Sequence, residues 1–117
     1  MARRGLMAES PEQDSYQKIK KLFDEKKFDE IIRYCQKLLV EDSKNKVALQ
    51  NISTAYNIVG GYQDAIETAD KMLKIDRTDE FALKNKMFAY EQLQNNDEAL
   101  NIIEKIEKLP TIWRDEV

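Results

Sequence analysis

The chain has 117 residues, of which 35% are charged and 42% are apolar, and it contains only three glycines and two prolines. This length suits one domain with a modest core, and the balance is too apolar for a disordered chain, so we expect an all-α protein. The net charge of -3 comes from interspersed acidic and basic residues, which disfavours nucleic acid as the main partner.

The sequence also lacks the marks of a membrane protein and of an enzyme. No apolar run approaches the length of a membrane span, and the first ten residues lack the apolar core of a secretory signal, so we expect no membrane insertion and a cytoplasmic location. Cys35 is the only cysteine and should be a small buried hydrophobe, because no histidine is present to activate its thiol. No phosphate loop, metal-ligand cluster or nucleophile with a base is found, so we expect no catalysis, no cofactor and no metal.

Residues 1–9 show no helical pattern and are expected to form a flexible tail. Ser10 and Pro11 then resemble a helix entrance, with a hydroxyl cap followed by a proline whose missing N–H is no loss. From here apolar residues recur at helical spacing through six segments, and the turns within successive pairs of segments are expected at Lys26–Lys27, Gly60–Gly61 and Asn95–Asn96.

The paired segments repeat at a fixed period. Phe28, Tyr62 and Asn96 each begin a similar pentapeptide, and they follow one another at 34-residue intervals. Such a period indicates helical hairpins that bury their apolar faces by stacking on copies of themselves. The repeat domain then covers residues 10–113, with units at 12–45, 46–79 and 80–113, and residues 114–117 form a C-terminal tail.

These units resemble the tetratricopeptide repeat, which also has a 34-residue period. The eleventh position of each unit is Leu22, Tyr56 or Tyr90, and the twentieth is Ile31, Ala65 or Ala99, with the second unit closest to the family pattern. The resemblance implies an α-α superhelix of three antiparallel hairpins. A pentatricopeptide array is expected to be basic, and a coiled coil would lack the regular turns, so neither alternative fits.

The chain departs from the pattern where helices should approach closely. Ile19 and Ile31 replace the small residues in the first hairpin, so its helices should lie further apart than in the second, where Ser53 faces Ala65; the third should be intermediate. Lys86 also replaces a residue that is usually buried. The turn proline of the family is replaced by Ser43, Arg77 and Thr111.

In this family the first helix of each hairpin lines a concave groove that binds peptides. Carried over by position, the groove residues of this chain are Tyr16, Gln17, Lys20, Val47, Asn51, Thr54, Ile58, Phe81, Lys84, Asn85 and Phe88. Gln17, Asn51 and Asn85 share the sixth position, and each carboxamide could give an extended peptide both a donor and an acceptor. Exposed polar residues of a helix are the competing interpretation.

The known carboxylate clamp of the family does not fit this groove, because only Asn51 matches its residues. Tyr16, Val47, Ile58, Phe81 and Phe88 instead suggest apolar anchor pockets, with Lys20 and Lys84 favouring acidic flanks, although some aromatics could pack between repeats.

The last hairpin lacks the polar capping helix that usually covers such arrays. Apolar residues are therefore expected to need cover at Ile102, Ile106, Leu109, Ile112 and Trp113. A fold-back of residues 109–113, pairing with another copy, or a longer parent protein would each supply it. We therefore expect an adaptor that binds a protein or peptide partner, with a self-assembly module forming homodimers as the alternative.

Overall fold

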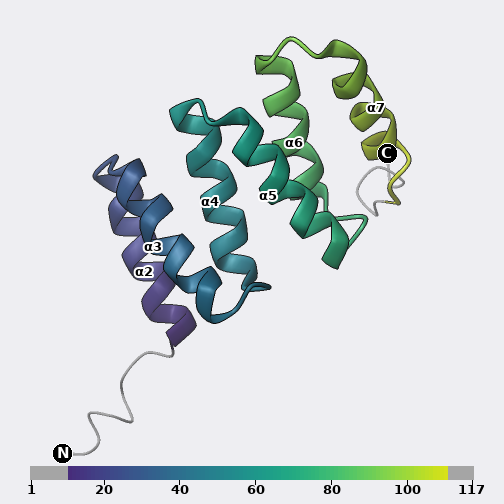
Figure 1. The fold of residues 1–117 in the computed structure, drawn as a ribbon. Coiled ribbons are helices and arrows are strands. Elements are labelled where there is room, and N and C mark those ends of the chain that lie inside the picture. The colour runs from purple at the N-terminus through teal and green to yellow at the C-terminus, as the bar shows by residue number, and fades with distance from the viewer. Residues whose placement is uncertain (1–10, 111–117) are drawn as a thin grey trace, which may run out of the picture.

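The protein is described by a computed structural model that covers residues 11–110, and this part of the chain contains six α-helices and no strand. The helices, shown in Figure 1, are α2 (Pro11–Asp24), α3 (Phe28–Glu41), α4 (Lys46–Val59), α5 (Tyr62–Ile75), α6 (Glu80–Gln92) and α7 (Asn96–Glu107). Short connections join them, and consecutive helices pack side by side. The expected all-α class is confirmed.

The predicted turns agree with the structure at two of three places. Lys26–Lys27 and Gly60–Gly61 lie between helices, but Asn96 is the first residue of α7. The third turn is shifted because the Asn95 side chain accepts a hydrogen bond from the backbone N–H of Glu98 at 3.3 Å, which caps the helix before Asn96. Pro11 begins α2 as predicted, whereas Ser10 and residues 111–117 lie outside the described part.

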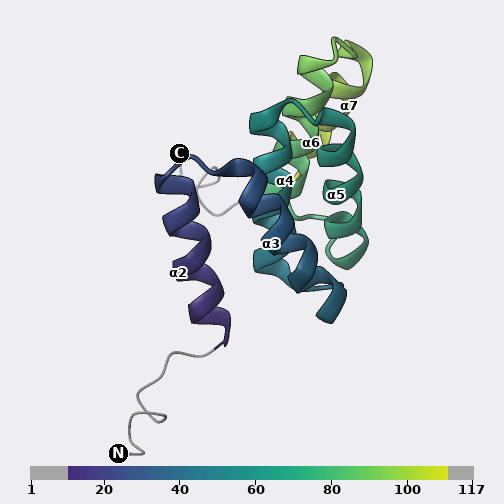
Figure 2. The same ribbon diagram turned by 60° about the vertical axis from the view of Figure 1, so that its left-hand side comes forward.

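The helices alternate between two kinds of neighbour. Helix α4 contacts α2 and α6 as well as its sequence neighbours, whereas the backbones of α3, α5 and α7 do not approach one another closely. The described helices are therefore arranged in two rows, one continuous and one open, as the two views in Figures 1 and 2 show. The molecule is elongated, with extents of 57 × 35 × 25 Å.

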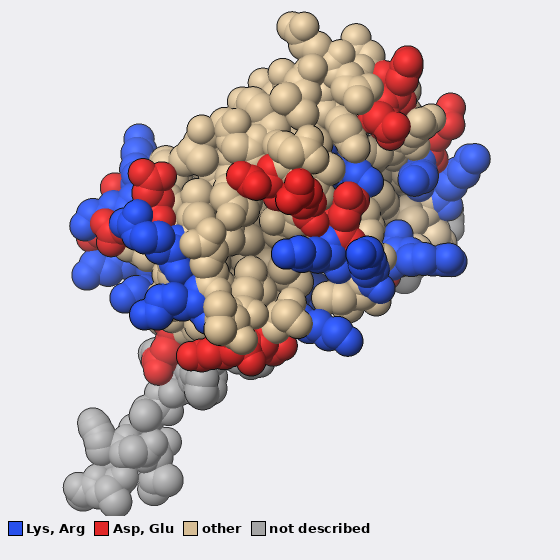
Figure 3. Space-filling model, in the orientation of Figure 1, with Lys and Arg blue, Asp and Glu red and all other residues tan. Residues whose placement is uncertain are grey.

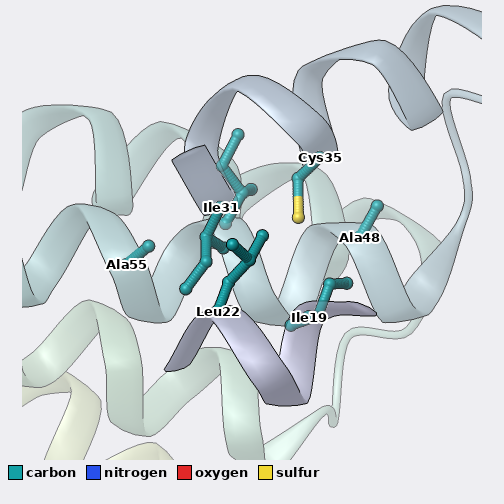
Figure 4. Close-up of a cluster of buried hydrophobic side chains, with 7 residues drawn as sticks. Ile19, Leu22, Ile31, Cys35, Ala48 and Ala55 are labelled. Atoms are coloured by element: carbon teal, nitrogen blue, oxygen red, sulfur yellow. The ribbon is translucent and has the colours of Figure 1, made fainter. Parts of the chain in front are cut away.

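The core consists of successive clusters that join neighbouring helices. Figure 4 shows the first cluster, in which Ile19 and Leu22 of α2 meet Ile31 and Cys35 of α3 against alanines of α4. Burial raises the pKa of the Cys35 thiol to about 12, so this group stays protonated and behaves as the predicted small hydrophobe. Further clusters join α4, α5 and α6, and then α6 and α7.

The first hairpin is the loosest of the three, as predicted from its bulky isoleucines. Helix α2 stands apart from α3 in Figure 2, whereas α4 and α5 pack closely, and Ser53 and Ala65 are fully buried. The third hairpin is not intermediate, because α6 and α7 pack about as tightly as α4 and α5. Met87 does not separate them, since its side chain remains partly exposed at the edge of the interface.

All three hairpins turn through a left-handed residue at the same position of the repeat. The φ angles are +59° at Lys26, +88° at Gly60 and +61° at Gln94. The following residue then donates its N–H to a carbonyl five residues earlier, as in the bond of 2.7 Å from Gly61 to Tyr56. This is a Schellman-type helix end, which favours a residue without a Cβ atom.

The turns between hairpins also share one construction. Asp42 and Asp76 follow α3 and α5, and each carboxylate accepts the N–H two residues later at 3.0 Å. The next helices are capped by Asn45 and Asp79, whose side chains accept the N–H of Ala48 and Ala82 at 3.1 Å. These hydrogen bonds hold two turns that contain no proline.

Lys86 occupies its unusual position by reaching out of the interface. Its ammonium lies 2.7 Å from an Asp70 carboxylate oxygen and 6.0 Å from the centre of the Tyr90 ring. The lysine side chain is mostly buried and Asp70 is half exposed, so the stem packs between α5 and α6 while the charge finds a partner near the surface.

Candidate functional site

The predicted groove residues all lie on the continuous row of helices, α2, α4 and α6. The helical repeat places corresponding residues on corresponding faces, because the helix bounds of the three hairpins agree to within two residues in their units. Their side chains nevertheless differ in exposure and in hydrogen bonding, and they fall into three groups.

The first group is the carboxamides, which do not form a uniform series. Gln17 is exposed, and Asn51 donates its side-chain N–H to the carbonyl of Val47 in its own helix at 2.7 Å. Asn85 is instead engaged with the preceding repeat. Asn51 keeps its side-chain oxygen as an acceptor, so it and Gln17 are the members that face the surroundings with hydrogen-bonding capacity.

Asn85 is bound to Asn57, a contact that joins α6 to α4. The Asn57 amide nitrogen lies 3.1 Å from the backbone carbonyl oxygen of Asn85 and 3.3 Å from its side-chain oxygen. Asn57 is buried, and no described residue is bonded to its side-chain oxygen or to the side-chain nitrogen of Asn85. The sequence placed both residues on this row but could not indicate that they would bond to each other.

The second group consists of large apolar side chains that remain in solvent. The exposed fractions are 55% for Tyr16, 49% for Ile58, 40% for Phe81 and 43% for Phe88. Phe88 also makes an edge contact with Tyr62, with ring centres 6.4 Å apart. Val47 differs from these residues because it packs partly buried against the first core cluster. Four of the five predicted anchors are therefore available to a ligand.

The third group is already engaged within its own helices. Lys20 pairs with Asp24 at 3.3 Å and Lys84 pairs with Glu80 at 2.9 Å, both one helical turn apart. The Thr54 hydroxyl donates to the carbonyl of Gln50 at 3.0 Å. The two lysines remain well exposed, and such surface pairs are weak, so an acidic ligand could still replace their partners.

Two of the predicted groove residues, Lys84 and Phe88, also line a hollow in the last hairpin. A hollow of about 440 Å³ between α6 and α7 is lined by Lys84, Phe88, Met87, Ile103 and Ile106, with Glu91 and Glu107 at its edge. The corresponding residues of the earlier hairpins are covered by the next repeat, since Cys35 packs with Ala48, and Ala69 and Met72 with Ala82. The hollow therefore occupies the place of a following helix.

The residues predicted to self-associate are mostly used inside the last hairpin. Ile102 and Ile106 are buried with Leu83, and Leu109 packs partly buried against the same cluster. Ile112 and Trp113 lie outside the described residues. Besides Phe81 and Phe88, the large apolar side chains left in solvent on this hairpin are Leu93 and Leu100.

Charged groups of both signs are scattered over the face drawn in Figure 3, around a broad area of uncharged residues. Within residues 11–110 no group of three or more acidic or cysteine side chains is placed to hold a metal ion. None of the described helices combines the length and the apolar character that crossing a membrane requires.

The sequence was also compared with known proteins. A scan against protein-family models gives no match, and a search of curated proteins likewise gives none.

Proposed function

We propose that this chain is a protein-interaction adaptor of the tetratricopeptide type, which binds a short peptide or a partner helix along α2, α4 and α6. The proposal rests on two supports: the 34-residue resemblance in the sequence, and the large apolar side chains that this row of helices leaves in solvent. In a superhelical arrangement this row would line the concave side.

The observation that carries the proposal is the exposure of Tyr16, Ile58, Phe81 and Phe88. Exposing an aromatic or branched side chain is unfavourable by about 25 cal/mol for each Å² of apolar surface, so a ligand that covers these residues gains free energy. Aromatic anchors with low conformational entropy are also typical of interfaces in which few residues supply most of the binding energy.

Polar groups would orient the ligand between these anchors. The side-chain oxygen of Asn51 is available to accept a backbone N–H, and Lys20 and Lys84 could exchange their weak intrahelical pairs for acidic ligand residues. Asn85 has a different role, because the hydrogen bond that it accepts from Asn57 fixes the spacing of α4 and α6. We therefore assign ligand contact to Asn51 and Gln17, and alignment of the helices to Asn85.

Selection from a random peptide library displayed on phage tests this proposal. Peptides selected on the wild-type chain should bind the double variant Tyr16→Ala with Phe81→Ala at least about tenfold more weakly, because truncating an anchor residue typically costs a large share of the binding energy. Leu100→Ala is the matched control, since Leu100 is equally exposed but lies on α7. Full binding to the double variant, or failure to select any peptide, would refute the proposal.

The hollow between α6 and α7 favours a second candidate function, self-assembly. Its apolar lining corresponds to surfaces that the inner hairpins bury, and a second copy could cover it. Light scattering should then show a dimer whose dissociation is promoted by Ile103→Asp but not by Leu100→Asp. A chain that remains monomeric at high micromolar concentration would contradict the self-assembly function.

A further inference from the structure

The open row of helices contains a groove that is independent of the surface described above. The backbones of α3 and α5 do not approach each other closely, and α4 lies behind the space between them. A hollow of about 570 Å³ lies there, and a second of about 350 Å³ adjoins it along Leu39, Leu49 and Lys71. Together they form the α3–α5 groove, with α4 as its floor.

The larger hollow combines an apolar base with three lysines and Ser43. Leu39, Leu49 and Ile75 line it together with Lys44, Lys71 and Lys74, and no carboxylate belongs to its lining. None of these three lysines forms an ion pair with a described residue, in contrast to Lys20, Lys27, Lys84 and Lys86. Figure 3 shows Lys and Arg side chains gathered over the lower end of α5, where it is drawn in Figure 1.

Exposed apolar side chains border the groove on both walls. Val40 on α3 is 87% exposed, and Ile75 on α5 is 52% exposed. Both are β-branched residues near the ends of their helices. Helix positions that face solvent usually carry polar side chains. A ligand with an apolar strip would cover them and the edge of Leu39 at the same time.

We propose that the α3–α5 groove binds an acidic amphipathic helix of a partner protein. The charge complementarity is direct, because three unpaired lysines surround an apolar base. Lys71 and Lys74 are separated by one turn of α5, a rise of about 4.5 Å, and carboxylates three or four residues apart on an antiparallel or parallel helix repeat with the same spacing.

The shape and the surrounding charge favour a helix over other anionic ligands. Each wall is a helix of 14 residues, about 21 Å long, which matches a ligand helix of about four turns. The lysines border a recess and not a flat face, so a lipid surface would not reach its apolar base. Asp76 and Asp79 line the neighbouring hollow, so the cationic stretch ends there and is too short for a nucleic-acid backbone, which needs a long run of phosphate contacts.

A defined peptide tests the proposal without knowledge of the natural partner. The probe is a stapled, fluorescein-labelled helix of the length of α5, with leucines at positions i, i+3, i+4 and i+7 and glutamates at the other positions. Fluorescence anisotropy measures its binding to the full chain. A scrambled peptide of identical composition separates helical amphipathicity from net charge.

Two double variants with the same change in net charge locate the site. Lys71→Glu with Lys74→Glu should weaken binding by about tenfold or more, because two attractive contacts become repulsive. The control, Lys21→Glu with Lys105→Glu, reverses two exposed lysines in the last turns of α2 and α7 and should change binding by less than about threefold, as expected of remote screened charges. Circular dichroism shows that each variant is folded.

Ile75→Ser and Val40→Ser test the apolar half of the site and should each weaken binding of the amphipathic probe. Equal effects of the two lysine variants, or equal binding of the scrambled peptide, would overturn the proposal. It would also be overturned if phosphatidylserine vesicles retained the chain through Lys71 and Lys74 while the peptide failed to bind. Peptides selected for the α2–α4–α6 surface should be insensitive to these lysines, so each proposal can fail alone.

Discussion

Lys26, Gly60 and Gln94 occupy the same position of their units, and all three have the left-handed conformation. Only Gly60 has the residue type that adopts it without strain, and a Cβ atom added there would meet open space. The conformation, and not lack of room, is therefore what disfavours a side chain at these turns. Lys26 and Gln94 are held in it by the hydrogen bonds of the helix ends that they close.

Gln94→Gly should therefore stabilise the protein. Relief of the left-handed strain outweighs the added flexibility of glycine in the unfolded chain, and we expect the free energy of unfolding to rise by about 0.5 to 1 kcal/mol. Urea denaturation measures this change.

Lys27→Gly is the matched control for that substitution, because Lys27 also lies in a hairpin turn but has a φ of −93°. Here glycine brings only the entropic cost, so the free energy of unfolding should fall. A destabilised Gln94→Gly variant would show that its side chain makes a contribution that the backbone angle does not reveal.

The turns between hairpins are held by hydrogen bonds from side chains to the backbone. The carboxylates of Asp42 and Asp76 hold the backbone of these turns, and Asn45 and Asp79 cap the next helix. Asp76 is the more strongly bonded of the two aspartates, since it also accepts the Thr78 hydroxyl at 2.9 Å.

These bonds make one turn sensitive to acid. Hydrogen bonds from the backbone and the hydroxyl of Thr78 lower the pKa of Asp76 in the folded chain, with a smaller contribution from the charge of Lys46. The unfolded chain then binds the proton more readily, so Asp76 stabilises the fold above its ordinary pKa of 3.8, and this stabilisation is lost as the pH falls through the lowered folded value.

Urea midpoints measured from pH 6 downward through the ordinary pKa of Asp76 and below it test this linkage. Asp76→Asn should show a smaller decline in midpoint than the wild type, and Thr78→Val, which keeps the N–H bond but loses the hydroxyl, should be intermediate. Parallel curves for all three proteins would contradict the assigned role of Asp76.

The repeat period was enough to predict every helix, because each apolar stripe and turn recurs at a known offset. It misplaced the third turn by a residue, since the side chain of Asn95 acts as a cap there, and the sequence contains no glycine to mark the left-handed Gln94. The candidate site was less predictable. The position in the repeat assigns Asn51 and Asn85 to the same face of their helices. Asn51 nevertheless bonds within its own helix, whereas Asn85 bonds to Asn57 of another helix, and this difference depends on interhelical distance and on side-chain rotamers.

At the scale of the whole molecule, the two ends of the described array are unequal. Helix α2 is set apart from α3 and touches α4 only sparsely, whereas α7 packs tightly on α6. The central helices α4 and α5 are covered on both sides along the array. Opening should therefore begin at the first hairpin, because fewer buried contacts are lost there.

Hydrogen exchange followed by mass spectrometry should detect this asymmetry. Amides of α2 should exchange before those of α7, and those of α4 and α5 should exchange last, in proportion to the packing that must be broken. Ile31→Ala is not a suitable control for the order of exchange, because it also removes volume from the first core cluster. The variant Lys27→Gly, in the turn that follows α2, should accelerate hydrogen exchange of the α2 amides further. Equal protection of α2 and α4 would disprove graded opening.

The same neighbour-only packing bears on how the chain acquires its structure. Each of the six described helices contacts partners no more than two places away in sequence, so within residues 11–110 no helix pairing requires distant parts of the chain to find each other first. Chains dominated by such short-range contacts fold in microseconds to milliseconds, and the entropy lost in closing each intervening loop grows only slowly with its length. During synthesis, each hairpin can close soon after its own residues emerge and then serve as a template for the next.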